Sequence, residues 1–132
     1  MSPLKRLKRS VAVLISEGSE FLVIRRPDND DELPGIWGLP AGTLRDTETI
    51  QDVIRRIGED KLGVTLTPIY RVATGLQDRA AYRLEMELWK VSMQGTPKYP
   101  EWRWAPLEWL RHGMECGSLC CKLAVESKGR AS

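Results

Sequence analysis

The chain has 132 residues, of which 42% are hydrophobic, and its 20 lysines and arginines nearly balance 18 aspartates and glutamates. This length suits one folded domain with a hydrophobic core, and the apolar content excludes a disordered chain. A net charge of only +2 argues against a general nucleic-acid binder. We therefore expect a single domain over residues 1–132.

The N-terminal segment is basic. Residues 1–10 precede the first apolar run, and we expect them to form a solvated arm, with a phosphate-binding arm as the alternative. At the other end, we expect residues 127–132 to fray. The apolar runs are far shorter than the roughly 20 residues of a membrane helix, and we recognise no signal peptide. The basic residues of the arm are Lys5, Arg6, Lys8 and Arg9.

Two strands and an acidic loop are predicted next. Residues 11–16 and 20–26 are rich in apolar and β-branched side chains, and Gly18 marks the turn of a hairpin between them. Residues 27–34 then form a polar loop whose acids do not follow the order of a calcium-binding loop, so we interpret it as solvated. The acids are Asp28, Asp30, Asp31 and Glu32.

The main helix is predicted over residues 47–62. Thr47 can cap its start, and Gly63 can end it in the left-handed conformation. Gly58 inside this helix costs about 1 kcal/mol relative to alanine, which indicates that something other than helix propensity placed it there. The helix has one apolar stripe, formed by Ile50, Val53, Ile54 and Ile57.

The second half of the chain predicts more strands and two short helices. Alternating side chains predict a strand over residues 80–91, which follows a turn at residues 77–79. The strands outnumber the helices, and their hairpins predict an α/β fold with helices packed on a mixed sheet. The other predicted elements are strands at 68–74 and 102–106 and helices at 107–112 and 118–126.

Three cysteines are clustered near the C-terminus. An odd, clustered set predicts free thiols in a reducing cytoplasm rather than a disulfide framework. His112 and the first two cysteines fall at i, i+4 and i+8, so on one continuous helix they could ligate a soft metal. Gly113 and Gly117 interrupt that helix and a fourth ligand is lacking, so we favour a structural role. The cysteines are Cys116, Cys120 and Cys121.

A recognisable motif runs from residue 35 to residue 64. It opens with GIWGLPA at 35–41 and continues with five residues that match a spaced pattern without a gap. This segment resembles the signature of the Nudix hydrolase family, G-x5-E-x7-R-E-U-x-E-E-x-G-U, where U is a bulky aliphatic residue. The resemblance covers roughly residues 11–111 and implies an α/β/α sandwich around a mixed β-sheet. The matching residues are Gly42, Glu48, Arg56, Gly63 and Val64.

Three positions depart from that signature, and two of them are positions where the family binds metal. Ile57 and Lys61 stand where the family has glutamates, Gly58 replaces an aliphatic residue, and Asp60 conservatively replaces a glutamate. In the family, the carboxylates of this helix hold Mg²⁺ ions that bind diphosphate oxygens and help to activate water. A charge pair about 4 Å apart is worth about 4 kcal/mol at an effective dielectric of about 20. The two losses therefore predict metal affinity weaker by several kcal/mol.

One hypothesis is a metal-dependent hydrolase with a rearranged site. Asp60 and Glu59 resemble the family's glutamate pair displaced by one residue, and an irregularity at Gly58 could correct the displacement. We expect this pair to hold Mg²⁺ or Mn²⁺ with Glu48 or Glu101 close by, and we assign catalysis to the pair and Glu48. The resemblance then implies water attack on a pyrophosphate bond in a nucleoside diphosphate linked to another moiety.

The alternative hypothesis is a catalytically impaired module that binds a nucleotide or a partner. Lys61 brings an ammonium to the region where the metal would stand, so it could contact phosphate directly. Arg26 and Arg56 are further candidates for substrate binding. The resemblance also implies a structural role for Arg56, which would brace the loop against the helix together with Glu48.

We expect a nucleotide-type small molecule as the ligand, although the second hypothesis also allows a partner, and neither hypothesis involves a membrane. Nucleic acid is a weaker expectation, because the basic cluster at residues 5–9 is short and contains no interleaved aromatic residue. Dimers are common in the family, so the resemblance implies a homodimer as one expectation.

Overall fold

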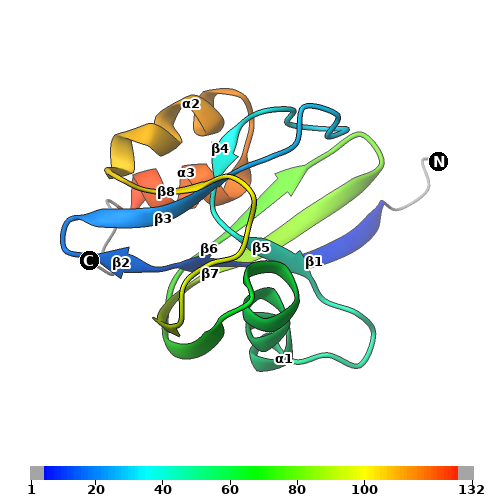
Figure 1. Ribbon diagram of the computed structural model, residues 1–132. Coiled ribbons are helices and arrows are strands. Elements are labelled where there is room, and N and C mark those ends of the chain that lie inside the picture. Colours follow the sequence, from blue (N-terminus) through cyan, green and yellow to red (C-terminus); the bar gives the residue numbers. More distant parts are fainter. Residues whose placement is uncertain (1–4, 128–132) are drawn as a thin grey trace.

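The computed structural model describes residues 5–127, in which the strands form two sheets and the helices lie on both sides of them (Figure 1). The strands are β1 (Arg6–Leu14), β2 (Ser16–Glu17), β3 (Glu20–Arg25), β4 (Trp37–Gly38), β5 (Ala41–Thr43), β6 (Thr65–Asp78), β7 (Tyr82–Gln94) and β8 (Trp102–Ala105). The helices are α1 (Ile50–Arg56), the π-helical turn η1 (Ile57–Leu62), the 3₁₀ turn η2 (Leu107–Trp109), α2 (Leu110–Glu115) and α3 (Leu119–Glu126).

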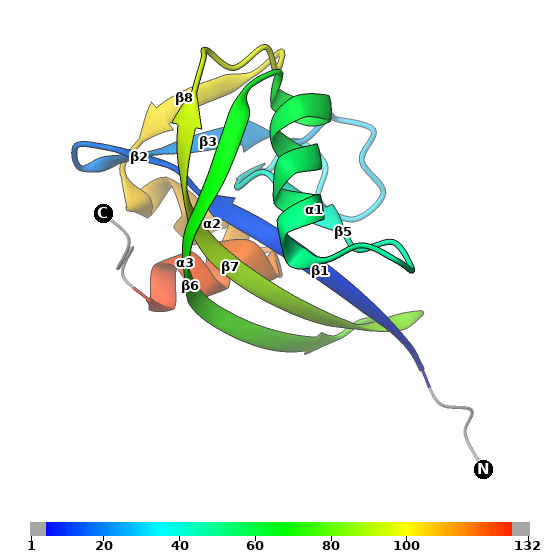
Figure 2. The same cartoon turned by 90° about the horizontal axis from the view of Figure 1, so that it is seen from below.

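The first sheet is mixed, with the strand order β5-β1-β7-β6. Strands β1 and β7 are parallel, from Arg6 opposite Tyr82 to Leu14 opposite Lys90, and the other pairs are antiparallel. Figure 2 shows the three long strands β1, β7 and β6 running side by side. The second sheet is antiparallel and contains β2, β3, β4 and β8. The predicted α/β class with a mixed sheet is therefore confirmed.

Strand β1 buries both of its faces over residues 10–14. Val11 and Val13 belong to a buried cluster shared with α1, whereas Ala12 and Leu14 belong to a cluster shared with α3, and all four are fully buried. Because successive side chains of a strand point to opposite faces, this alternation places one helical layer on each side of the sheet. Figure 1 shows α1 on one side, and α2 and α3 on the other.

The start of the main helix differs from the prediction. Thr49, not Thr47, is the N-cap of α1. The Thr49 hydroxyl accepts a hydrogen bond of 3.1 Å from the backbone N–H of Asp52, and the Asp52 carboxylate accepts one of 2.9 Å from the N–H of Thr49. This reciprocal pair satisfies two N–H groups at once, which explains why the helix begins after residue 49.

The end of the helix is also irregular. After Arg56 the chain continues as the π-helical turn η1, which Gly63 ends with a φ of 69°, as predicted. Gly58 lies at the start of this turn, where a Cβ atom would come within 2.8 Å of the Val64 backbone oxygen. The close approach of the backbone to Val64 explains why glycine stands here despite its low helix propensity.

The long hairpin extends beyond the predicted strands. Residues 65–78 and 82–94 are strand, so the strand prediction at 68–74 was too short and the turn lies at 79–81. The prediction of a solvated arm over residues 1–10 was wrong for residues 6–10, because they form the outer half of β1 and pair with β7. Residues 1–4 of that arm lie outside the described part of the chain. The short strands β4 and β5 were not predicted.

The C-terminal helices lie at their predicted positions, but the first of them is divided into two. The segment predicted as one helix at 107–112 consists of η2 followed by α2, and Ser118 is the N-cap of α3. Ser127, predicted to fray, is buried and caps the end of α3, while 128–132 lie outside the described residues. Within residues 5–127, every helix is too short to cross a membrane.

Candidate functional site

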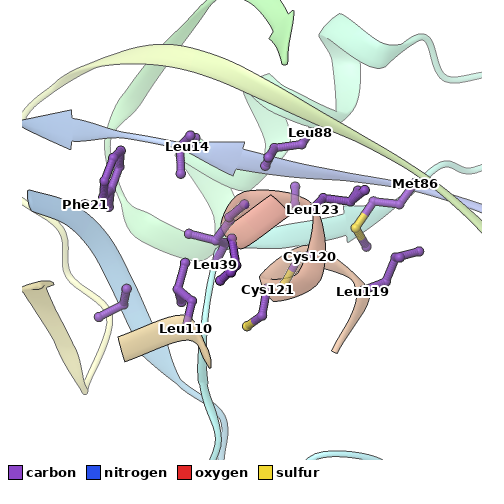
Figure 3. Packing of buried hydrophobic residues seen from close by; sticks show 14 of the residues in the cluster. Leu14, Phe21, Leu39, Met86, Leu88, Leu110, Leu119, Cys120, Cys121 and Leu123 are labelled. Carbon is purple, nitrogen blue, oxygen red and sulfur yellow. The ribbon is translucent and has the colours of Figure 1, made fainter. Parts of the chain in front are cut away.

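A pocket of about 280 Å³ lies beside the cluster that α3 shares with the first sheet. Its apolar lining includes Leu84 and Met86 of β7 and Leu119 of α3. Figure 3 shows Met86, Leu119 and Cys120 within this buried cluster. Residues of the acidic loop 27–34 and of strand β5 also line it. The pocket therefore combines an apolar surface with polar loops.

Cationic side chains outnumber carboxylates around this pocket. Arg26 pairs with Asp30 at 3.1 Å, and Arg79 pairs with Glu32 at 2.7 Å. Partial burial opposes ionisation of Asp30, but hydrogen bonds from the Leu33 backbone and from Arg26 outweigh it and lower the pKa of Asp30. Two further cations, Lys8 and Lys61, line the same pocket, so its surface favours an anion.

Lys61 reaches the pocket from η1. Its ammonium donates a hydrogen bond of 2.8 Å to the backbone oxygen of Ala41 in the edge strand β5. The residue as a whole is exposed, but desolvation of its ammonium and repulsion by Arg26 lower the pKa of Lys61. Within residues 5–127, Lys61 forms no salt bridge with a carboxylate. Its charge is therefore available to an anionic ligand.

Lys8 and Tyr82 form a second polar group in the lining. The Lys8 ammonium lies 4.8 Å from the centroid of the Tyr82 ring, which is a cation–π contact. The Tyr82 hydroxyl donates to the Glu32 carboxylate at 2.9 Å, and burial together with this hydrogen bond raises the pKa of Tyr82. Glu32 also pairs with Arg79, so these four side chains connect β1, the acidic loop and the β6–β7 hairpin.

Glu48 and Arg56 brace the loop before α1 against the helix. The Glu48 carboxylate accepts two hydrogen bonds from Arg56, at 2.9 and 3.0 Å, and one from the backbone N–H of Arg45. Arg56 also donates to the Thr43 backbone oxygen at 2.7 Å. These hydrogen bonds lower the pKa of Glu48 to about 2. The pair has the bracing geometry that the resemblance implied, and both side chains lie outside the pocket lining of the described residues.

The predicted metal ligands do not converge. Glu59 and Asp60 are exposed on η1, and the pocket lining in the described part of the chain includes neither. Glu101 instead pairs with Arg25 at 3.0 Å, and Arg25 also pairs with Asp28. The catalytic roles assigned to Asp60, Glu59 and Glu48 stay predictions.

The donor chemistry at this place does not fit a divalent cation of the family type. Ile57 is 2% exposed and packs in the core beside α1, and Lys61 contributes a positive charge. Among residues 5–127, no group of three or more histidine, cysteine, aspartate or glutamate side chains could hold a metal ion. Since Mg²⁺ takes oxygen ligands, the residues present here do not supply its usual coordination.

Only part of this pocket could be predicted from the sequence. Arg26 and Lys61, predicted as substrate-binding residues, both line it. They lie close enough for the charge of Arg26 to repel that of Lys61. Lys8, Arg79 and Tyr82 were missed, because they were assigned to an arm, a turn and a strand face. The alternation of the strand at 80–91 placed Tyr82 on the face of Leu84 and Met86, and that signal could have found it.

The cysteines do not form the metal site that a continuous helix would have allowed. Gly117 has a φ of 99° between α2 and α3, so His112 in α2 and Cys116 at its C-cap are separated from Cys120, which lies in α3. All three cysteines are free, as predicted. Cys120 and Cys121 are buried in the cluster beside the pocket, which is the structural role that we favoured.

Comparisons with solved structures show the same fold. The MutT protein from Methanosarcina mazei is 23% identical with a TM-score of 0.80, over 98% of this chain and 98% of that chain. A NUDIX hydrolase from Nitrosomonas europaea is 13% identical with a TM-score of 0.77, over 95% and 90% of the two chains. A MutT NUDIX hydrolase from Burkholderia pseudomallei is 20% identical with a TM-score of 0.69, over 79% and 86%.

The family comparison agrees with the structural ones. No curated protein matches the chain. The model of the NUDIX domain matches residues 6–117, which extends from the first residue of β1 to the turn before α3. The match includes the strands of both sheets, α1 and the loops that line the pocket. The chain therefore belongs to the NUDIX domain family.

Proposed function

We propose that this domain binds a phosphorylated, nucleotide-type small molecule in the pocket without a divalent metal. The observation that carries the proposal is the Lys61 ammonium, which enters the pocket at a position where the Nudix signature has a metal-binding carboxylate. An ammonium is a compact cation with three donors, so it can neutralise a phosphate directly. The nearby Arg26 supports the same preference for an anion.

The metal-dependent hydrolase is the second candidate. The π-helical turn η1 favours this candidate, because a displaced carboxylate pair requires a helix irregularity at Gly58 to redirect its side chains. The turn nevertheless leaves Glu59 and Asp60 exposed, and Glu101 is held by Arg25. We therefore place binding by Lys61 ahead of hydrolysis.

Calorimetric titration in EDTA tests the proposal. The probes are nucleoside triphosphates, ADP-ribose, dinucleoside polyphosphates and CDP-alcohols, each titrated into the full chain. The test variant is Lys61→Met, and its matched control is Lys122→Met, which removes an exposed ammonium from α3. A charge-assisted hydrogen bond contributes about 1.5–3 kcal/mol, so Lys61→Met should weaken binding about 10- to 100-fold, and Lys122→Met should not.

The same panel distinguishes the two candidates. Binding that persists in EDTA without turnover in Mg²⁺ or Mn²⁺ supports the binding module. Turnover of a probe that needs the metal and is lost in Asp60→Asn would contradict our proposal and establish the hydrolase. Equal binding by wild type and Lys61→Met would also contradict it.

A further inference from the structure

We infer that the pocket holds two anionic groups of one ligand, one at Lys61 and the other at Lys8, joined by a largely apolar spacer. The inference rests on the proposed function, because it takes Lys61 as the site of the first phosphate. It adds a second subsite, which the family signature does not contain, at the outer end of β1. The ligand class that it predicts is a small molecule phosphorylated at two separated positions.

Strand register sets the separation of the two lysines. Lys61 bonds to Ala41, and Ala41 lies opposite Ala12 of β1. Lys8 precedes Ala12 by four residues on the same strand, which corresponds to about 13 Å at about 3.3 Å per residue. Both lysines line the same pocket. The Lys8 ammonium lies over the ring of Tyr82, whose register partner is Arg6, farther from Ala12 than Lys8 itself, so the two ammonium groups define separate subsites.

The pocket's carboxylates are already paired with its arginines. Asp30 holds Arg26, and Glu32 holds Arg79. By contrast, the ammonium groups of Lys8 and Lys61 contact a neutral ring and a neutral carbonyl, respectively. In the described part of the chain, neither lysine forms a salt bridge. The positive charge that the loop does not neutralise is therefore located at the two lysines.

The surface between the two lysines combines apolar side chains with the mutually hydrogen-bonded hydroxyls of Ser10 and Thr43. Leu84 of β7 is level with Lys8, and Met86 is level with Ser10, so both lie along the path between the subsites. Leu119 from α3 lines the same pocket. Figure 3 shows Met86 and Leu119 in one buried cluster. An alkyl or aromatic spacer fits this surface, because it would bury apolar area without leaving polar groups unpaired.

A molecular ruler tests the two subsites. The probes are α,ω-alkanediol bisphosphates of increasing chain length and the matching alkyl monophosphates, titrated calorimetrically into the full chain in EDTA. We expect the bisphosphates to bind about tenfold or more tightly than the monophosphates at one favoured length. Lys8→Met should abolish this advantage, Lys8→Arg should retain it, and Lys122→Met serves as the surface-charge control.

The outcomes separate this inference from the proposed function. Equal affinity for mono- and bisphosphates of every length, or a full bisphosphate advantage in Lys8→Met, would overturn the second subsite and leave Lys61 binding intact. Lys61→Met should weaken both probe classes. If no bisphosphate binds, the second subsite is overturned, whereas the proposed function stands or falls with the nucleotide titrations of wild type and Lys61→Met.

Discussion

Glu48 shows, at the scale of one residue, the bracing geometry that its position in the signature implies. Its carboxylate is held by Arg56 and by the backbone N–H of Arg45, and it lies outside the pocket lining of the described residues. The position was predicted both as a catalytic residue and as a brace. The geometry matches the brace, because both carboxylate oxygens already accept hydrogen bonds.

The pairing of Glu48 predicts an acid-sensitive contribution to stability. The pKa of Glu48 falls from 4.5 to about 2 in the folded state, so its contribution is present above pH 4.5 and is lost as the pH falls from 4.5 towards 2. In Glu48→Gln this part of the pH dependence should disappear. Urea denaturation between these two pH values measures the slope, with Glu126→Gln as the control for removing an exposed carboxylate. An unchanged slope in Glu48→Gln would contradict the assignment.

Lys61 predicts a pH dependence of ligand binding. Desolvation and the Arg26 charge lower the pKa of Lys61 below 10.5, and only the ammonium form attracts a phosphate. Affinity should therefore fall as the pH rises through this lowered pKa, at a pH at which an ordinary lysine is still charged. Titrations of a nucleotide probe across alkaline pH measure the effect. Lys61→Arg stays charged throughout, so any binding that it retains should show a flatter profile.

At the scale of elements, η1 decides which side chain enters the pocket. The π-helical turn packs Ile57 into the core, leaves Glu59 and Asp60 exposed, and directs Lys61 to Ala41. A regular helix would rotate successive side chains by about 100° each, so the extra residue of a π turn changes their aim. The local backbone therefore has as much influence on the site as the residue types.

Gly58→Ala tests the backbone constraint behind η1. Alanine improves helix propensity by up to about 1 kcal/mol, but its Cβ would lie 2.8 Å from the Val64 backbone oxygen and 2.9 Å from Leu66. We expect a net loss of about 1–3 kcal/mol in the free energy of unfolding. Chemical denaturation measures it, and Gln51→Ala at an exposed position of α1 is the control. A stabilised Gly58→Ala variant would show that η1 is not constrained by this contact.

At the scale of the whole molecule, the first sheet connects two buried clusters. Leu14 packs on the side of α3 and Ile54 belongs to the cluster beside α1, and both are fully buried. Strand β1 contributes to both clusters through its alternate side chains. Loosening either cluster should therefore destabilise the other, and we propose that the chain unfolds as a single domain.

Two alanine substitutions test this coupling. Leu14→Ala and Ile54→Ala should each lower the free energy of unfolding by about 2–5 kcal/mol, because each leaves a cavity in a close-packed core. Both should shift one cooperative transition, seen together by tryptophan fluorescence and far-UV circular dichroism. Two separate transitions, with each variant shifting a different one, would contradict a single cooperative unit.

Several features could be predicted from the sequence because their cause is local. Alternation in β7, the apolar stripe of α1 and the left-handed end at Gly63 depend on neighbouring residues, and they indicated the α/β class. The spaced motif from residue 35 to residue 64 indicated the family. The departures at Ile57 and Lys61 were visible in the same motif, and the weak metal binding that they imply stays a prediction.

Tertiary structure alone decided the extent of β1 and the composition of the pocket. Arg6–Ser10 looks like a solvated basic arm in sequence, and it becomes strand only because β7 supplies its hydrogen-bond partners. Lys8, Lys61 and Tyr82 come from three separate segments, and no local pattern relates them. The physical reason is that strand pairing and charge contacts act between residues distant in sequence, whereas propensity and capping act between near neighbours.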